Sequence, residues 1–124
     1  MDKVDLDRQI KDAVGAHGCW KLQLKEAVAT GKLPWSAEQI SQDDQCTFGK
    51  WLVKLRQDPE IGDSPYFQAV AQAHSRFHQA AGHIATCVEK NRRDAATELL
   101  SSGDFQKIAD RLGKAIIDWR KSLH

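Results

Sequence analysis

His74 and His78 stand four residues apart in a segment with strong helical periodicity. In an α-helix, residues i and i+4 share a face, with their Cβ atoms roughly 5–6 Å apart. Two imidazole nitrogens at this spacing can converge on one ion. The pair alone is a weak motif, because helical histidines also occur as solvated or core residues.

Two further residues strengthen the metal hypothesis. His17 falls in the middle of the apolar stripe of an expected first helix, and Cys46 stands where a short helix is expected to begin. Neighbouring helices lie about 8–10 Å apart, so inward side chains from three of them can meet. Three imidazoles and one thiolate form the tetrahedral nitrogen and sulfur set that Zn²⁺ prefers.

Burial energetics favour the same interpretation. Placing an imidazole on an apolar stripe costs several kcal/mol unless it finds a partner, and a shared ion provides one for all three histidines. A core histidine bonded to a backbone carbonyl or a carboxylate is the alternative for any one of them. For the four residues together, the pattern predicts a zinc site.

Helical periodicity defines the elements that must position these ligands. The stripe of Ile10, Val14, His17, Lys21, Leu24 and Val28 predicts a first helix over residues 5–29, ended by Gly31 and Pro34. A capping-box pattern at residues 36–39 predicts a short turn. Further helices are expected over residues 46–56, 64–89 and 94–100, with a loop over 61–65, and a last helix is expected to start at Asp104.

Nothing in the sequence resembles a strand. Three long helices and one short helix with brief connections predict an all-α fold, an up-and-down four-helix bundle whose short helix carries Cys46. A length of 124 residues indicates one domain, residues 1–124.

Composition limits the classes of function. A formal charge of +1 argues against nucleic-acid binding or an electrostatic membrane contact, and no apolar run approaches a membrane span. The N-terminus lacks the apolar core of a signal peptide, so a cytoplasmic location is expected. Three widely spaced cysteines make a poor disulfide framework and fit a reducing compartment.

Three short motifs carry a resemblance to a known family. Residues 17–20 (HGCW), 46–51 (CTFGKW) and 74–78 (HSRFH) resemble the motifs of the bacterial chemoreceptor zinc-binding (CZB) domain. The resemblance extends over nearly the whole chain and implies His17, Cys46, His74 and His78 as zinc ligands. It also implies a homodimeric, cytoplasmic regulatory domain that stands alone or is joined to a chemotaxis receptor or a diguanylate cyclase.

Cys46 carries the reactive chemistry. A thiol at a helix N-terminus and on a cation is deprotonated and nucleophilic, and its oxidation to sulfenate weakens the metal bond. The resemblance implies a sensor of zinc or of oxidants such as hypochlorous acid. A structural zinc in a dimerisation or interaction module, with no sensing role, is the alternative.

The remaining candidates have weaker interpretations. Trp20 and Trp51 are expected to form a dry shell around the metal, although an ordinary core role is equally compatible. Packing roles are expected for Cys19 and Cys87, a surface position for His83, and solvated linker acids for Asp43 and Asp44, whereas His124 is uninformative.

Catalytic and carrier functions are disfavoured. Four protein ligands leave no open position for a zinc-bound water, and no HExxH-type base lies beside the histidines. Di-iron bundles require a Glu-x-x-His pattern, but Ala71 and Ser75 precede His74 and His78 at that spacing. Haem would be visible in the absorption spectrum. The sequence therefore predicts a non-catalytic zinc module with a signalling partner or a fused output domain.

Overall fold

The computed structural model describes the backbone of residues 2–33, 35–42 and 46–123, and their side chains except those of residues 14–21 and Thr47. Over these ranges the chain is all-helical, as the sequence predicts, and contains no strand. Its helices are α1 (Lys3–Thr30), α2 (Ala37–Ser41), α3 (Thr47–Arg56), α4 (Pro59–Gly62), α5 (Pro65–Glu89), α6 (Arg93–Ser101) and α7 (Gly103–Ser122).

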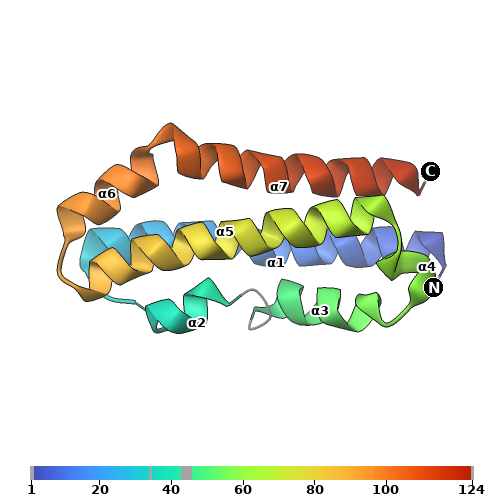
Figure 1. Ribbon diagram of the computed structural model, residues 1–124, viewed down its shortest axis with the longest axis horizontal. Coiled ribbons are helices and arrows are strands. Elements are labelled where there is room, and N and C mark those ends of the chain that lie inside the picture. Colours follow the sequence, from blue (N-terminus) through green and yellow to red (C-terminus); the bar gives the residue numbers. More distant parts are fainter. Residues whose placement is uncertain (1, 34, 43–45, 124) are drawn as a thin grey trace.

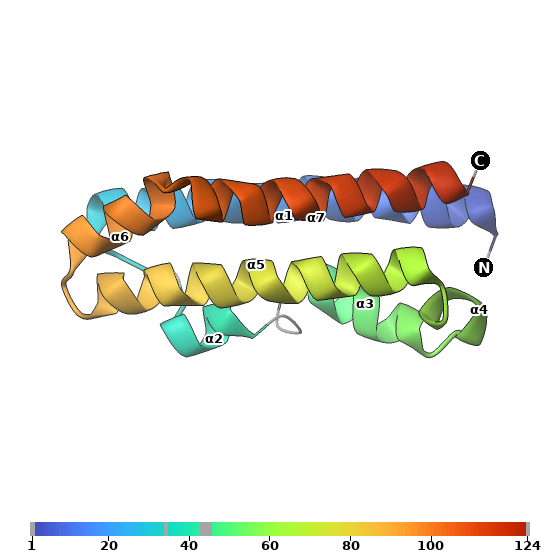
Figure 2. The same cartoon turned by 45° about the horizontal axis from the view of Figure 1, so that its top comes forward.

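Three long helices, α1, α5 and α7, run side by side along the length of the molecule (Figure 1). The short helices α2 and α3 follow one another along the face of α5 that is opposite α7 (Figure 1). Turning the molecule shows α7 over α1, and shows α5 between α7 and the pair of short helices (Figure 2). Helix α5 is therefore the central element against which α1, α2, α6 and α7 pack.

Local sequence signals set most helix boundaries. Gly31 ends α1 in the left-handed conformation (φ 76°), and its N–H bonds to the carbonyl of Ala27. Ser36 and Gln39 form the predicted capping box at the start of α2. Cys46 is the N-cap of α3, and Ser64 precedes Pro65 at the first position of α5.

Two boundaries differ from the sequence-based expectation. Residues 59–62 form the single-turn helix α4 directly after α3, where the sequence predicts a helix end and then a loop from residue 61. Asp58 starts this turn, because its side chain accepts a hydrogen bond from Glu60 N–H, and Pro59 fixes the first helical φ angle. At the last helix, Ser102 is the N-cap, and Asp104 lies inside the first turn.

The apolar stripes form one hydrophobic core, as predicted. Eight predicted inward residues of α5 are all buried: Phe67, Val70, His74, Phe77, His78, Ala81, Ile84 and Val88. The other helices contribute Ile10, Leu24, Val28, Phe48, Leu52, Phe105, Leu112, Ile116 and Trp119. Among the side chains that the structure describes, His74 and His78 are the buried polar ones in this core.

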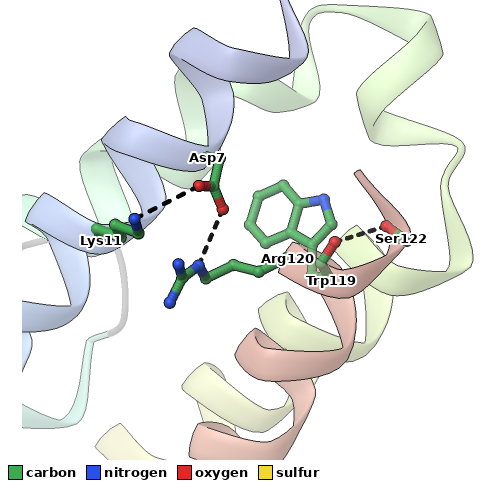
Figure 3. Close-up of polar contacts among 5 residues, drawn as sticks. All are labelled: Asp7, Lys11, Trp119, Arg120 and Ser122. Carbon is green, nitrogen blue, oxygen red and sulfur yellow. Dashed lines mark hydrogen bonds and ion pairs between the residues drawn. The ribbon is translucent and has the colours of Figure 1, made fainter. Parts of the chain in front are cut away.

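A polar contact joins α1 to α7 at the end of the molecule where both termini lie (Figures 1 and 3). Arg120 Nε donates to Asp7 Oδ1 at 2.9 Å, and Lys11 Nζ lies 3.8 Å from Asp7 Oδ2 (Figure 3). Beside this carboxylate, Trp119 is buried and Ser122 Oγ donates to its backbone carbonyl. The contact fixes the register of α1 against α7 at this end of the molecule.

Helix α2 lies close to α5 because position 82 is glycine. A Cβ built on Gly82 would lie 2.5 Å from Ser41 Cβ and 2.9 Å from Ser41 Cα. The atoms in the way include backbone, so a larger residue would push α2 outward. The buried side chains of α2, Ala37 and Ile40, depend on this close approach.

Among the described helices, none combines the length and apolar character that crossing a membrane requires.

Replacing Gly82 by Ala should destabilise the protein, by the roughly 1–3 kcal/mol typical of overpacking. Gly113→Ala in α7 is the matched control, because a Cβ at Gly113 meets no described atom within 4 Å. That variant should gain roughly 0.5–1 kcal/mol from helix propensity alone. Thermal unfolding of the two variants should therefore shift in opposite directions, and a stabilised Gly82→Ala protein would contradict the packing described here.

Candidate metal centre

Cys46, His74 and His78 come together at one point in the core. Cys46 Sγ lies 3.4 Å from His74 Nε2 and 3.4 Å from His78 Nε2. The possible ligand atoms of all three residues lie within 4.8 Å of one another. Each histidine is only 1% exposed, whereas Cys46 is half-buried.

Helix α5 positions both imidazoles through its regular spacing. His74 and His78 are one turn apart, and their rings meet edge to face with centroids 4.5 Å apart. Phe48 of α3 packs against the His74 ring at 4.8 Å, and Phe77 packs against His78 at 5.8 Å. The two rings are therefore held by apolar neighbours while their Nε2 atoms face the thiol.

The start of α3 positions the sulfur. Cys46 has extended backbone angles, and its Sγ accepts a hydrogen bond from Gly49 N–H at 3.2 Å. This contact is the ordinary N-cap interaction, with sulfur in place of the usual side-chain oxygen. A helix N-terminus and a backbone donor both favour the thiolate, the form that binds metals.

The tautomer of His78 follows from a second contact. His78 Nδ1 lies 2.8 Å from the carbonyl oxygen of Ile40 in α2. A carbonyl only accepts, so Nδ1 carries a proton, and in the neutral form of the ring Nε2 presents a lone pair. A metal-binding histidine commonly donates its second ring N–H in this way, which orients the ligand.

The two distances from sulfur to nitrogen fit a zinc ion. Zinc bonds of about 2.3 Å to sulfur and 2.0–2.1 Å to nitrogen, at tetrahedral angles, place a sulfur ligand roughly 3.5 Å from each nitrogen ligand. Both Sγ to Nε2 distances are 3.4 Å. One thiolate and two imidazoles also match the ligand softness of zinc.

The structure brings together three of the four predicted ligands. His17 belongs to α1, which contacts both α3 and α5, but its side chain lies outside the described residues. Its role as the fourth ligand therefore stays a prediction.

The predicted aromatic shell is only partly described. The side chain of Trp20 lies outside the described residues. Trp51 is half-buried, contacts Phe48 at 5.7 Å between ring centroids, and donates from Nε1 to Gln9 at 2.8 Å. Since Phe48 in turn packs on His74, Trp51 is connected to the centre through one intervening ring.

Other candidates behave as expected where they are described. His83 is exposed, and Cys87 is a half-buried residue packed against the core. Neither belongs to the ligand cluster. The side chain of Cys19 and the residues Asp43, Asp44 and His124 lie outside the described parts of the chain.

Three participants in the centre were not identified from sequence. They are the carbonyl of Ile40, the N–H of Gly49, and the Phe48 ring as the residue that covers His74. Backbone groups leave no composition signal of their own. The capping box at Ser36 was the only available hint, because it marks a helix that must pack against another element.

The fold and this site define a helical domain with a Cys-His-His cluster that can hold a metal ion. A profile of the chemoreceptor zinc-binding domain (CZB) family matches residues 17–85, which is more than half of the chain. The chain therefore belongs to the chemoreceptor zinc-binding domain family, and its cofactor is Zn²⁺. Searches of curated proteins and of solved structures each return no match.

Cys46→Ala should lower zinc affinity by more than the roughly 10–100-fold that changes around a metal's ligands typically cost, because it removes a ligand outright. Cys87→Ala is the matched control, a half-buried cysteine outside the cluster. Competition with a chromogenic zinc chelator measures the zinc affinity of Cys46→Ala and of Cys87→Ala. Equal zinc retention by the two variants would contradict Cys46 as a ligand.

Proposed function

We propose that this chain is a non-catalytic zinc-binding regulatory domain that responds to zinc level, to oxidants such as hypochlorous acid, or to both through Cys46. One observation supports this most strongly: Cys46 Sγ lies against two buried imidazoles, yet the residue itself is half-buried. The residue can therefore contribute a metal ligand while it remains partly open to small solutes.

His17 is the proposed fourth ligand. The resemblance of residues 17–20 to the family's first motif supports it, as does the packing of α1 against α3 and α5. Four protein ligands would close the coordination sphere, which is typical of structural and regulatory zinc rather than of catalytic zinc. This is why we propose a domain without enzymatic activity.

His17→Ala should weaken zinc binding by at least tenfold, since a three-ligand site would remain. His83→Ala is the matched control, because His83 is exposed and lies outside the cluster. The zinc content of His17→Ala and of His83→Ala is compared after dialysis against a chelator. Full retention of zinc in His17→Ala would remove His17 from the ligand set.

The redox step uses the Cys46 thiolate as a nucleophile. The thiolate takes OH from hypochlorous acid, so that sulfur loses two electrons and chlorine leaves as chloride. The sulfenic acid formed is a poorer ligand than the thiolate. Sulfur would also become a poorer N-cap acceptor for Gly49 N–H, so oxidation changes the start of α3 as well as the metal site.

The proposed biological context follows from the family. We place this domain in bacterial chemotaxis or cyclic-di-GMP signalling, in the cytoplasm, with a separate partner or a fused receptor or cyclase as its output. Residues 1–124 would form one domain, an up-and-down four-helix bundle in which α2 and α3 together provide the short column.

Exposed apolar side chains support the proposed homodimer. Val4 and Leu22 are 71% and 66% exposed on α1, and Ile117 is 52% exposed on α7, which packs beside α1. Val4 and Leu22 are about five full turns apart and so share a face. The homodimer is what the family resemblance implies, and a second copy packed along this face of α1 would cover Val4 and Leu22.

Treating the zinc-loaded protein with one equivalent of hypochlorous acid should release zinc and produce a sulfenic acid on Cys46. A zinc-responsive dye and a sulfenate-specific probe with mass spectrometry measure the two events. Thiol reductants should restore zinc binding. If zinc stays bound and Cys46 stays unmodified while Cys87 is oxidised, the sensing role fails, and a structural zinc in an interaction module becomes the better account.

A further inference from the structure

Helix α2 has five residues, too few to be stable alone, so its position depends on what holds it. Two of its contacts to α5 are polar and lie near its opposite ends. At its C-terminal end, the carbonyl of Ile40 meets His78 Nδ1 at 2.8 Å. At its N-terminal end, Ala37 N–H donates to Glu89 Oε1.

The N-terminal contact uses a residue in an unfavourable place. Glu89 is the last residue of α5, where a negative charge is repelled by the helix dipole. Its carboxylate reaches instead to the first N–H of α2, where the dipole attracts it. Ala37 is 7% exposed, so its N–H needs a partner on folding. The Glu89 carboxylate is therefore better placed electrostatically as a partner for the start of α2 than as the last residue of α5.

The two polar contacts are mechanically connected. Between them α2 is one helical turn held by its capping box and seated over Gly82, and Ser41 rests on that glycine. From α2 the connection continues to the metal centre. The Ile40 carbonyl oxygen contacts His78 Nδ1, and Nε2 of the same ring contacts Cys46 Sγ. Glu89 lies 11 residues beyond His78, about 16 Å along α5.

We infer that Glu89 is a positioning residue for the metal centre, which acts through α2 by holding the Ile40 carbonyl against His78. The inference rests on the zinc-binding role proposed above and extends that role to α2. Docking of α2 and binding of zinc then stabilise each other, because an ion at Nε2 requires the proton at Nδ1, and Ile40 accepts that proton's hydrogen bond. Coupling of this kind is reciprocal.

Glu89→Ala should weaken zinc binding roughly five- to tenfold, measured by chelator competition. Hydrogen exchange of the amides of residues 37–41 should be faster in this variant, and zinc should slow it less than in the wild type. Glu89→Gln keeps an oxygen that can accept a hydrogen bond from Ala37 N–H. Its zinc affinity should therefore lie between those of the wild type and of Glu89→Ala. Glu98→Ala, which removes an exposed glutamate from α6, should match the wild type.

A purely structural role for Glu89 predicts a different pattern. General destabilisation would lower the Tm of the zinc-free variant. The coupling predicts, in addition, a smaller zinc-induced rise in Tm at subsaturating zinc than in the wild type, whereas general destabilisation alone leaves that rise unchanged. If Glu89→Ala and Glu98→Ala bind zinc equally and exchange α2 amides equally, Glu89 has no positioning role, although the zinc proposal stands. If the wild type binds no zinc, the zinc proposal itself fails.

Discussion

Two buried imidazoles in an apolar core are the constraint on which the structure depends. His74 and His78 are each 1% exposed, at positions where regular spacing would normally place apolar residues. Burying such groups costs several kcal/mol unless their nitrogens find partners. Both Nε2 atoms lie 3.4 Å from Cys46 Sγ, so the sulfur, and an ion held between the three residues, would supply those partners.

Much of the remaining architecture brings other elements to this point. Cys46 can reach the histidines because α3 begins beside α5, with its sulfur bonded to Gly49 N–H. Phe48, two residues after Cys46, packs against the ring of His74. On the other side, Gly82 admits α2, and α2 brings the carbonyl of Ile40 to His78. A change of state at the sulfur would therefore affect α3 directly and α2 through His78.

The sequence predicts the helices and three of the residues that meet in the cluster, because both leave periodic signals. Periodicity predicts the inward stripe of α5, including His74 and His78, residue by residue, and it places Cys46 where α3 begins. The turn at residues 59–62 was missed because proline usually signals a helix end, whereas here Asp58 lets it start a new turn. The contacts of Ile40 and Glu89 to other helices could not be predicted, because they depend on how closely α2 approaches α5.

X-ray absorption at the zinc edge of the purified protein identifies the atoms bound to the ion and so shows whether Cys46 is one of them. A site made of Cys46, His17, His74 and His78 would give one sulfur ligand at about 2.3 Å and three nitrogen ligands at about 2.0–2.1 Å. After hypochlorous acid treatment, the sulfur contribution should disappear together with the bound zinc. A spectrum of the untreated protein with no sulfur ligand, or with oxygen and nitrogen ligands alone, would contradict a centre built around Cys46.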